Sequence, residues 1–283
     1  MGDVCAVDIT TSNIQVLVRR GGGRVDGIEG GLRPAVVEDG RVAQPDEVRE
    51  TISRLLLALR ARPAEFRMVL SDSACVSRLV EYPPMPHSEL KRSIRVEAEH
   101  ELPMNPHSAY LDWQLVRTDG KGNGVLMVGA WRDLVDDYID ALEGVGHVSI
   151  VEPRSMALAR AAGFPDAVLV DLTGDRIQAV LVEEYCVTLS TTTTLFAGGT
   201  PSALRLSQAV AGMIPRPAGR RAPLPRQVVF TGELFGREDV AEGLRRQPAA
   251  HAFEVLAEWD APEAFQRFIS EGQAANVGLL MRN

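Results

Sequence analysis

Two segments of the chain follow the same plan: an apolar run, a polar turn that opens with an aspartate, and a second apolar run. They are residues 4–18, with Asp8, and residues 167–182, with Asp171. Short apolar runs bounded by turn residues are typical of buried strands, so each segment predicts a β-hairpin. The N–H groups of such a turn can form a concavity for an anion, and its carboxylate can hold a phosphate-bound metal ion through water. The sequence therefore predicts an internal duplication with a candidate phosphate loop in each half.

Between and after these hairpins, helical and strand patterns alternate, which predicts a mixed α/β (α+β) fold. Apolar residues recur on one face of residues 45–62, and Pro63 closes that helix. Prolines also bracket a predicted amphipathic helix over residues 89–102. The other predicted strands are 66–70, 109–117, 125–131, 185–196 and 227–230, and the other predicted helices are 132–142, 154–162, 203–213 and one from about 262.

Length and composition set the class of protein. The chain has 283 residues, enough for two domains, and 45% hydrophobic with 24% charged residues indicates a globular protein. The net charge of −8 argues against nucleic acid as a partner. No apolar run approaches the roughly 18 residues of a membrane helix, and no export signal opens the chain. We expect a cytoplasmic protein whose three cysteines, Cys5, Cys75 and Cys186, are buried thiols.

The segment from Val80 to Pro103 carries the most distinctive motif. It contains Pro-x-Met-Pro, then Glu-Leu, then Glu-Ala-Glu, then Leu-Pro. This order resembles the small inserted subdomain of the PilM family, the actin-like proteins of type IV pilus assembly platforms. The stretch 149–153, apolar residues followed by Glu-Pro, and the C-terminal residues 274–282 are also similar to that family. FtsA-like proteins and the cytoplasmic domains of GspL-type secretion proteins share the broader architecture.

The resemblance implies a duplicated actin-like, ribonuclease-H-like fold with a small inserted α/β subdomain. It places the first subdomain at residues 1–78 and 146–164, the inserted one at 79–145, and the second actin-like subdomain at 165–283. The family's fourth subdomain is expected to be reduced or absent, because a Pro-rich basic linker leads directly from helix 203–213 to strand 227–230.

The candidate nucleotide loops depart from the family's pattern at its glycines. Thr10 stands where the first loop has Gly, Thr173 does so in the second loop, and Glu233 replaces one glycine of the adenosine motif. A β-branched residue resists positive φ and fills the space through which backbone approaches phosphate. Asp8 and Asp171 are accordingly expected to cap their own turns instead of holding a metal ion. The residues of these vestigial loops are Asp8, Thr10, Thr11, Ser12, Asn13, Asp171, Thr173, Gly174, Gly198, Gly199, Gly232 and Glu233.

Other site chemistry finds no support in the sequence. The histidines are scattered, and no Walker loop, Gly-x-Ser-x-Gly elbow or Gly-x-Gly-x-x-Gly motif occurs. No catalytic residue and no metal site is predicted, and the eroded loops argue against an enzyme. No cofactor is expected, with ATP and magnesium as the ligands if the loops still bind.

Two functions therefore compete. The first is a scaffold of a type IV pilus or related secretion platform, and the alternative is a nucleotide-switched ATPase of the PilM or FtsA kind. The resemblance implies a PilN-like, membrane-anchored partner whose cytoplasmic tail binds in the groove between the inserted subdomain and the first domain, so that membrane association runs through partners. Self-association is left open. We expect the tail to bind along residues 79–86 and 89–102; the competing interpretation is that Met85, Leu90 and Ile94 fill the subdomain core.

Overall fold

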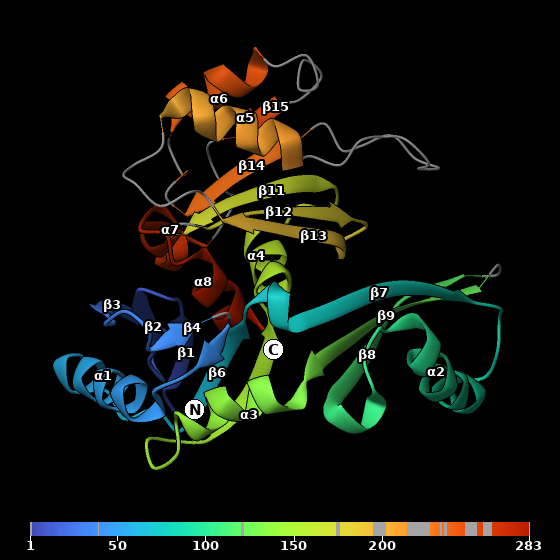
Figure 1. Cartoon of the computed structure of the whole chain (residues 1–283), viewed down its shortest axis with the longest axis horizontal. Helices are drawn as coiled ribbons and strands as arrows, with labels where there is room; N and C mark the ends of the chain where they lie inside the picture. The colour runs from blue at the N-terminus through green and yellow to red at the C-terminus, as the bar shows by residue number, and fades with distance from the viewer. Residues whose placement is uncertain are drawn as a thin grey trace.

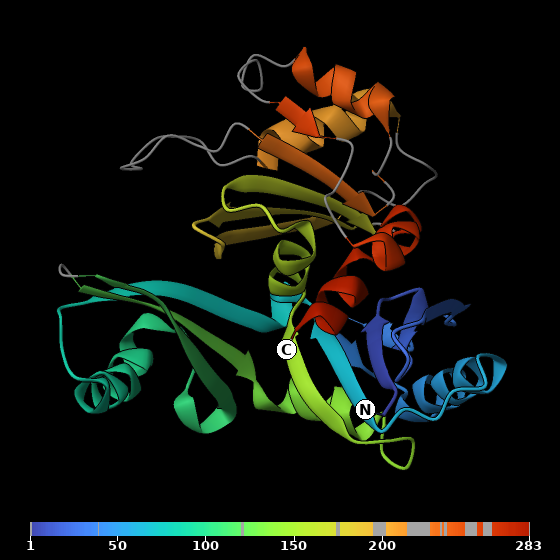
Figure 2. The same ribbon diagram turned by 180° about the vertical axis from the view of Figure 1, so that it is seen from behind.

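Two five-stranded sheets alternate with layers of helices, and a smaller sheet projects to one side (Figures 1 and 2). The computed structural model describes residues 2–38, 40–119, 122–173, 176–194, 202–213, 227–232, 234, 237–246, 254–256 and 262–282. No helix in these ranges is both long and apolar enough to cross a membrane.

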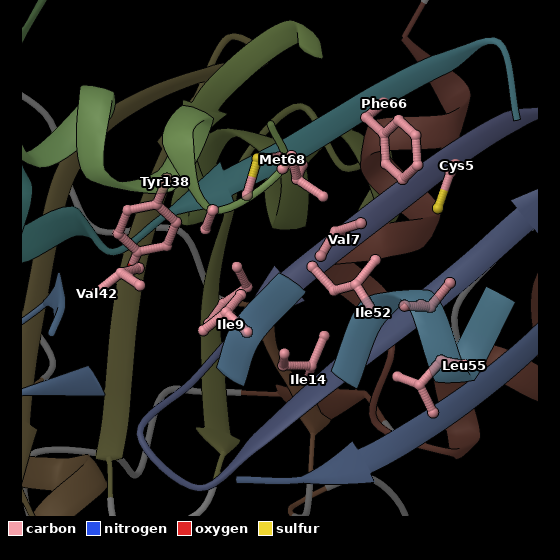
Figure 3. Packing of buried hydrophobic residues seen from close by; sticks show 14 of the residues in the cluster. Cys5, Val7, Ile9, Ile14, Val42, Ile52, Leu55, Phe66, Met68 and Tyr138 are labelled. Atoms are coloured by element: carbon pink, nitrogen blue, oxygen red, sulfur yellow. The ribbon is translucent and has the colours of Figure 1, made fainter. Parts of the chain in front are cut away.

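The first sheet has the strand order β10-β6-β1-β2-β3. Its outer face packs against α1 and α3 and buries Phe66, Met68 and Tyr138 almost completely (Figure 3). The predicted helix 45–62 ends earlier, at Ala58, because Arg60 adopts a left-handed conformation (φ 51°) that a helix cannot continue through. The elements are β1 (Val4–Ile9), β2 (Asn13–Arg19), β3 (Val25–Gly31), β6 (Glu65–Leu70), β10 (Val148–Pro153), α1 (Pro45–Ala58) and α3 (Arg132–Asp140), with the short ladder β4 (Val37–Glu38) and β5 (Arg41–Val42).

The small sheet, in the order β7-β9-β8, carries α2 on one face. Leu90, Ile94 and Ala98 of α2 are buried against it. The competing interpretation is therefore confirmed for Leu90 and Ile94, which fill the subdomain core, with Met85 partly buried against it. Binding of the tail along residues 79–86 and 89–102 stays a prediction. The elements are β7 (Cys75–Tyr82), α2 (His87–Glu101), β8 (Ala109–Asp119) and β9 (Gly122–Trp131), with single turns η1 (Asp72–Ala74) and η2 (Pro106–Ser108).

The second sheet repeats the plan of the first, with the order β13-β12-β11-β14-β15. Helices α5 and α6 cover its outer face, as Figure 1 shows. The elements are β11 (Ala167–Thr173), β12 (Arg176–Glu183), β13 (Cys186–Thr194), α5 (Ala203–Met213), β14 (Gln227–Gly232), α6 (Glu238–Arg245) and β15 (Glu254–Leu256). The linker 214–226, on which the missing fourth subdomain was predicted, lies outside the described residues.

A layer of helices lies between the two large sheets and shares one core with both. It consists of α4 (Arg154–Ala162), α7 (Glu263–Ser270) and α8 (Ala274–Met281). The single final helix predicted from residue 262 is two helices, because Gly272 takes a positive φ of 80° between them. The predicted duplication and the mixed α/β class are confirmed. The subdomain boundaries remain predictions, and α3, placed in the inserted subdomain, buries its apolar side in the core of the first sheet.

The crossing of α4 and α8 depends on a glycine. A Cβ on Gly278 would lie 1.8 Å from the carbonyl oxygen of Ala157, whereas a Cβ on Gly212, in α5, would meet no atom within 4 Å. Gly278→Ala should lower the free energy of unfolding by about 1–3 kcal/mol through overpacking. Gly212→Ala should raise it by up to about 1 kcal/mol through helix propensity. Urea unfolding of both variants tests this, and equal effects would refute the close crossing.

Candidate functional site

The two predicted aspartates face each other across the middle layer. Side chains alternate between the two faces of a strand. On β1, Ala6 packs into the middle core, so Asp8, two residues later, points the same way. On β11, Leu169 packs into that core and Asp171 follows it. The duplicated hairpins therefore bring one carboxylate from each half to a common cleft.

Arg154, the first residue of α4, bridges these carboxylates. Its Nη1 donates to Asp8 Oδ2, and its Nη2 donates to Asp171 Oδ2 at 3.0 Å and to the Thr173 hydroxyl at 3.0 Å. The side chains of Arg154, Asp8 and Asp171 are only 11%, 5% and 3% exposed. A planar guanidinium can engage carboxylates on two sides at once, which an ammonium group does less well. A cation of the chain itself thus lies between the two predicted loops.

A second polar contact joins the halves beside the first. Asp72, in η1, accepts hydrogen bonds from Gln178 Nε2 and Ser190 Oγ of the second half. It also accepts one from the backbone N–H of Ser155, the residue after Arg154, at 3.2 Å. Loss of hydration raises the pKa of the Asp72 carboxyl above its usual 3.8, although these donors oppose the rise.

The first loop is closed by its threonine. The Thr10 hydroxyl accepts from the N–H groups of Ser12 (3.3 Å) and Asn13 (3.0 Å), and it lies 2.6 Å from Asn13 Oδ1, to which it donates. The prediction that Asp8 caps this turn is therefore wrong, since Asp8 is bound by Arg154 instead. For Asp171 it is partly right, because the carboxylate accepts from the Thr173 hydroxyl at 2.9 Å as well as from Arg154.

The glycine substitutions have simple structural consequences. Neither Thr10 nor Thr173 is among the residues with positive φ, so a threonine is unstrained at both positions. Gly232 has a φ of 62°, and a Cβ there would lie 2.1 Å from the Leu172 carbonyl oxygen, which requires glycine whether or not a ligand binds. Four predicted site residues lie outside the described residues: Gly174, Gly198, Gly199 and Glu233.

The described residues leave a cavity of about 60 Å³ between the loops. Three carboxylates and two guanidinium groups line it, a formal balance of −1. The sequence analysis predicted the residues of both loops that line this cavity. It missed three other lining residues, Arg154, Asp72 and Gln178. The duplication could have pointed to Gln178. In each hairpin a glutamine, Gln15 or Gln178, stands at the same distance in sequence after the aspartate and lies opposite that aspartate on the paired strand. The residues lining the cavity include Asp8, Thr10, Thr11, Ser12, Asp72, Arg154, Asp171, Thr173, Arg176 and Gln178.

A larger groove lies between the small sheet and the first sheet. Its α3 end has a volume of about 380 Å³ and continues into a more polar part of about 450 Å³. Asp112, Val128 and Glu152 line both parts. Because strand residues alternate, Val128 faces this groove while its neighbour Met127 faces α2. The groove therefore lies between the inserted subdomain and the first sheet, where a groove was predicted. Its lining comes from the sheet face opposite α2 and not from residues 79–86 and 89–102.

The groove has an apolar end and a charged end. At the α3 end, Tyr110, Leu111 and Ile139 are each about 40% exposed. In the more polar part, Glu152 Oε2 accepts hydrogen bonds from Arg160 Nη2 of α4 (2.9 Å) and from Arg282 Nη1 of the C-terminal segment (2.8 Å).

Comparison with known proteins assigns the chain to a family. The sequence matches the family described as "Type IV pilus assembly protein PilM" over residues 6–191, which is more than half of the chain. The chain belongs to the PilM family. No curated protein matches it in sequence.

Solved structures agree on the fold. The chain is similar to one in a PilM–PilN type IV pilus biogenesis complex, with a TM-score of 0.71, 20% identity and 99% and 98% of the two chains covered. It is also similar to the cytoplasmic domain of EpsL, an inner membrane component of the type II secretion system of Vibrio cholerae (TM-score 0.54, 15% identity, 81% and 82% covered). The ethanolamine utilization protein EutJ from Carboxydothermus hydrogenoformans follows, with a TM-score of 0.56, 13% identity and 98% and 90% covered. The predicted actin-like fold of this PilM family member is thereby confirmed.

The raised pKa of Asp72 predicts a pH dependence of stability. As the pH rises above 3.8, the unfolded chain loses this proton first, while the folded protein keeps it until its higher pKa is reached. The contribution of Asp72 to the free energy of unfolding should therefore fall as the pH rises through this window. The free energy of unfolding, measured with denaturant between pH 3.5 and about 6, should change with pH by a less negative slope for Asp72→Asn than for the wild type. Identical slopes would contradict the assignment.

Proposed function

We propose that this PilM family member is an adaptor of a type IV pilus assembly platform that binds the cytoplasmic tail of a PilN-like membrane protein. The observation that carries the proposal is the groove between the small sheet and the first sheet, in a chain whose fold resembles one from a PilM–PilN complex. The protein would then work at the inner face of the cell membrane and reach it through that partner.

The groove suits an extended peptide. It is bordered by β8 and β10, and each of these strands pairs with only one neighbour in the described structure. An unpaired strand edge offers N–H and C=O groups to an added strand, while pockets beside it select alternate side chains. The apolar end near Ile139 supplies such a pocket, and Asp112 and Arg282 supply polar contacts at the other end.

The same proposal includes a nucleotide cleft that has lost its function. Pockets for small molecules usually measure about 300–1,000 Å³, far more than the cavity of about 60 Å³ between the loops. The two carboxylates that would face a phosphate-bound metal ion are already paired with Arg154. The described residues thus do not fit magnesium-bound ATP, and no step of the proposed function depends on it. A nucleotide switch would require Arg154 to leave both partners.

Weak nucleotide binding is the first expected outcome. Titration calorimetry with Mg²⁺ and ATP should give no heat signal of binding at low micromolar concentrations, because the cavity is small and its carboxylates are paired. A dissociation constant in that range corresponds to a binding free energy of about −8 kcal/mol. It would overturn the proposed loss of nucleotide binding in favour of the nucleotide switch.

Binding in the groove is tested by replacing an exposed apolar residue that lines it, with a similar residue outside the groove as the control. Ile139→Ser, in α3, should weaken binding of a synthetic PilN-like tail peptide about fivefold or more, the effect of losing roughly 1 kcal/mol of apolar contact. Ile139 is 38% exposed, so the melting temperature should change little. Fluorescence anisotropy with a labelled peptide measures the affinity.

The matched control is Leu57→Ser in α1, where the leucine is 79% exposed and lies outside the groove. Val96→Ser tests the site first expected on α2, since Val96 is 64% exposed there. Both controls should bind the peptide like the wild type. Loss of binding in Val96→Ser with normal binding in Ile139→Ser would move the docking surface back to α2.

A further inference from the structure

The cleft between the two halves contains its own cation. Asp8 belongs to the first sheet and Asp171 to the second, and both are almost fully buried. Two buried carboxylates that face one another repel unless a positive charge lies between them. In this chain Arg154 supplies that charge from the N-terminus of α4, within hydrogen-bond distance of both.

We infer that Arg154 is a built-in clasp that holds the two halves in one relative orientation without any bound nucleotide. Its guanidinium takes the position where a ligand cation would have to neutralise the two loops. The three nitrogens of the group all donate, Nε and Nη2 to Asp171 and Nη1 to Asp8, so that the side chain is fixed from two sides.

The adjacent residue strengthens the clasp. The backbone N–H of Ser155 donates to Asp72 of the first half, whose carboxylate accepts from Gln178 and Ser190 of the second half. The first turn of α4 therefore contacts the polar groups of both sheets through two consecutive residues. Opening the cleft would break all of these contacts together.

The clasp also lies next to the groove in the chain. Glu152 and Pro153 line the groove, and Arg154 follows them directly. Fixing Arg154 thus fixes the part of the groove wall that these two residues form. This consequence concerns rigidity alone, and the clasp itself does not depend on which partner the groove binds.

Charge replacement tests the clasp by thermal unfolding of the full chain. Arg154→Met should lower the melting temperature by roughly 10 °C, because two buried carboxylates lose their partner. Adding Asp8→Asn and Asp171→Asn to Arg154→Met should recover most of this loss, since no charge is then buried alone. Arg33→Met is the control, because Arg33 pairs with Glu47 at an exposed position, and its shift should stay within about 2 °C.

The orientation of the halves is measured by electron spin resonance between labels on Leu57→Cys and Leu204→Cys. These positions are 79% and 59% exposed, on α1 of the first half and α5 of the second. Cys75 and Cys186 are replaced by Ser in this background, and Cys5 is fully buried. The distance distribution should be narrow and unchanged by Mg²⁺ and ATP, and the triple variant, which folds without the charges, should show a broader one.

Three results would overturn the inference. They are an Arg154→Met variant as stable as the wild type, a triple variant no more stable than Arg154→Met, and a wild-type distance that shifts on addition of Mg²⁺ and ATP. None of them bears on binding of the tail peptide, so the clasp and the groove can fail separately.

Discussion

The structure depends on a layer of helices that is shared by two sheets. Helices α4 and α8 cross closely at Gly278, and each also contacts the sheet of the other half. A core built in this way cannot be divided into two independent units, because its apolar residues come from both halves. Packing in this shared core therefore joins the two sheets before any ligand is considered.

The polar cluster of the cleft is a consequence of this arrangement. The N-terminus of α4 lies between the ends of β1 and β11, so a long side chain at its first position reaches both aspartates. An arginine there forms ion pairs with two carboxylates that would otherwise favour a metal ion. One residue can thus convert a cleft of actin-like geometry into a fixed joint, while the surrounding backbone keeps the shape of the family.

The groove follows from a second property of the fold, the two-sidedness of the small sheet. Helix α2 covers one face of that sheet, and the other face turns toward β10 and α3. Because α3 packs into the first core and also contacts β8 and β9, it attaches the small sheet to the first half at the α3 end of the groove. A peptide bound there would contact the two parts of the molecule at once, which would suit the proposed adaptor function.

The sequence by itself determined the duplicated hairpins, the mixed α/β class, the resemblance to the PilM family and the positions of most helices. These features depend on local periodicity and on short motifs, which a linear pattern records directly. It also indicated that Thr10 and Thr173 change the loops. Only the tertiary structure decided that Arg154, 146 residues from Asp8 in the chain, pairs with it, and which face of the small sheet borders the groove. Contacts between distant residues depend on how layers pack, and no periodicity within one segment encodes them.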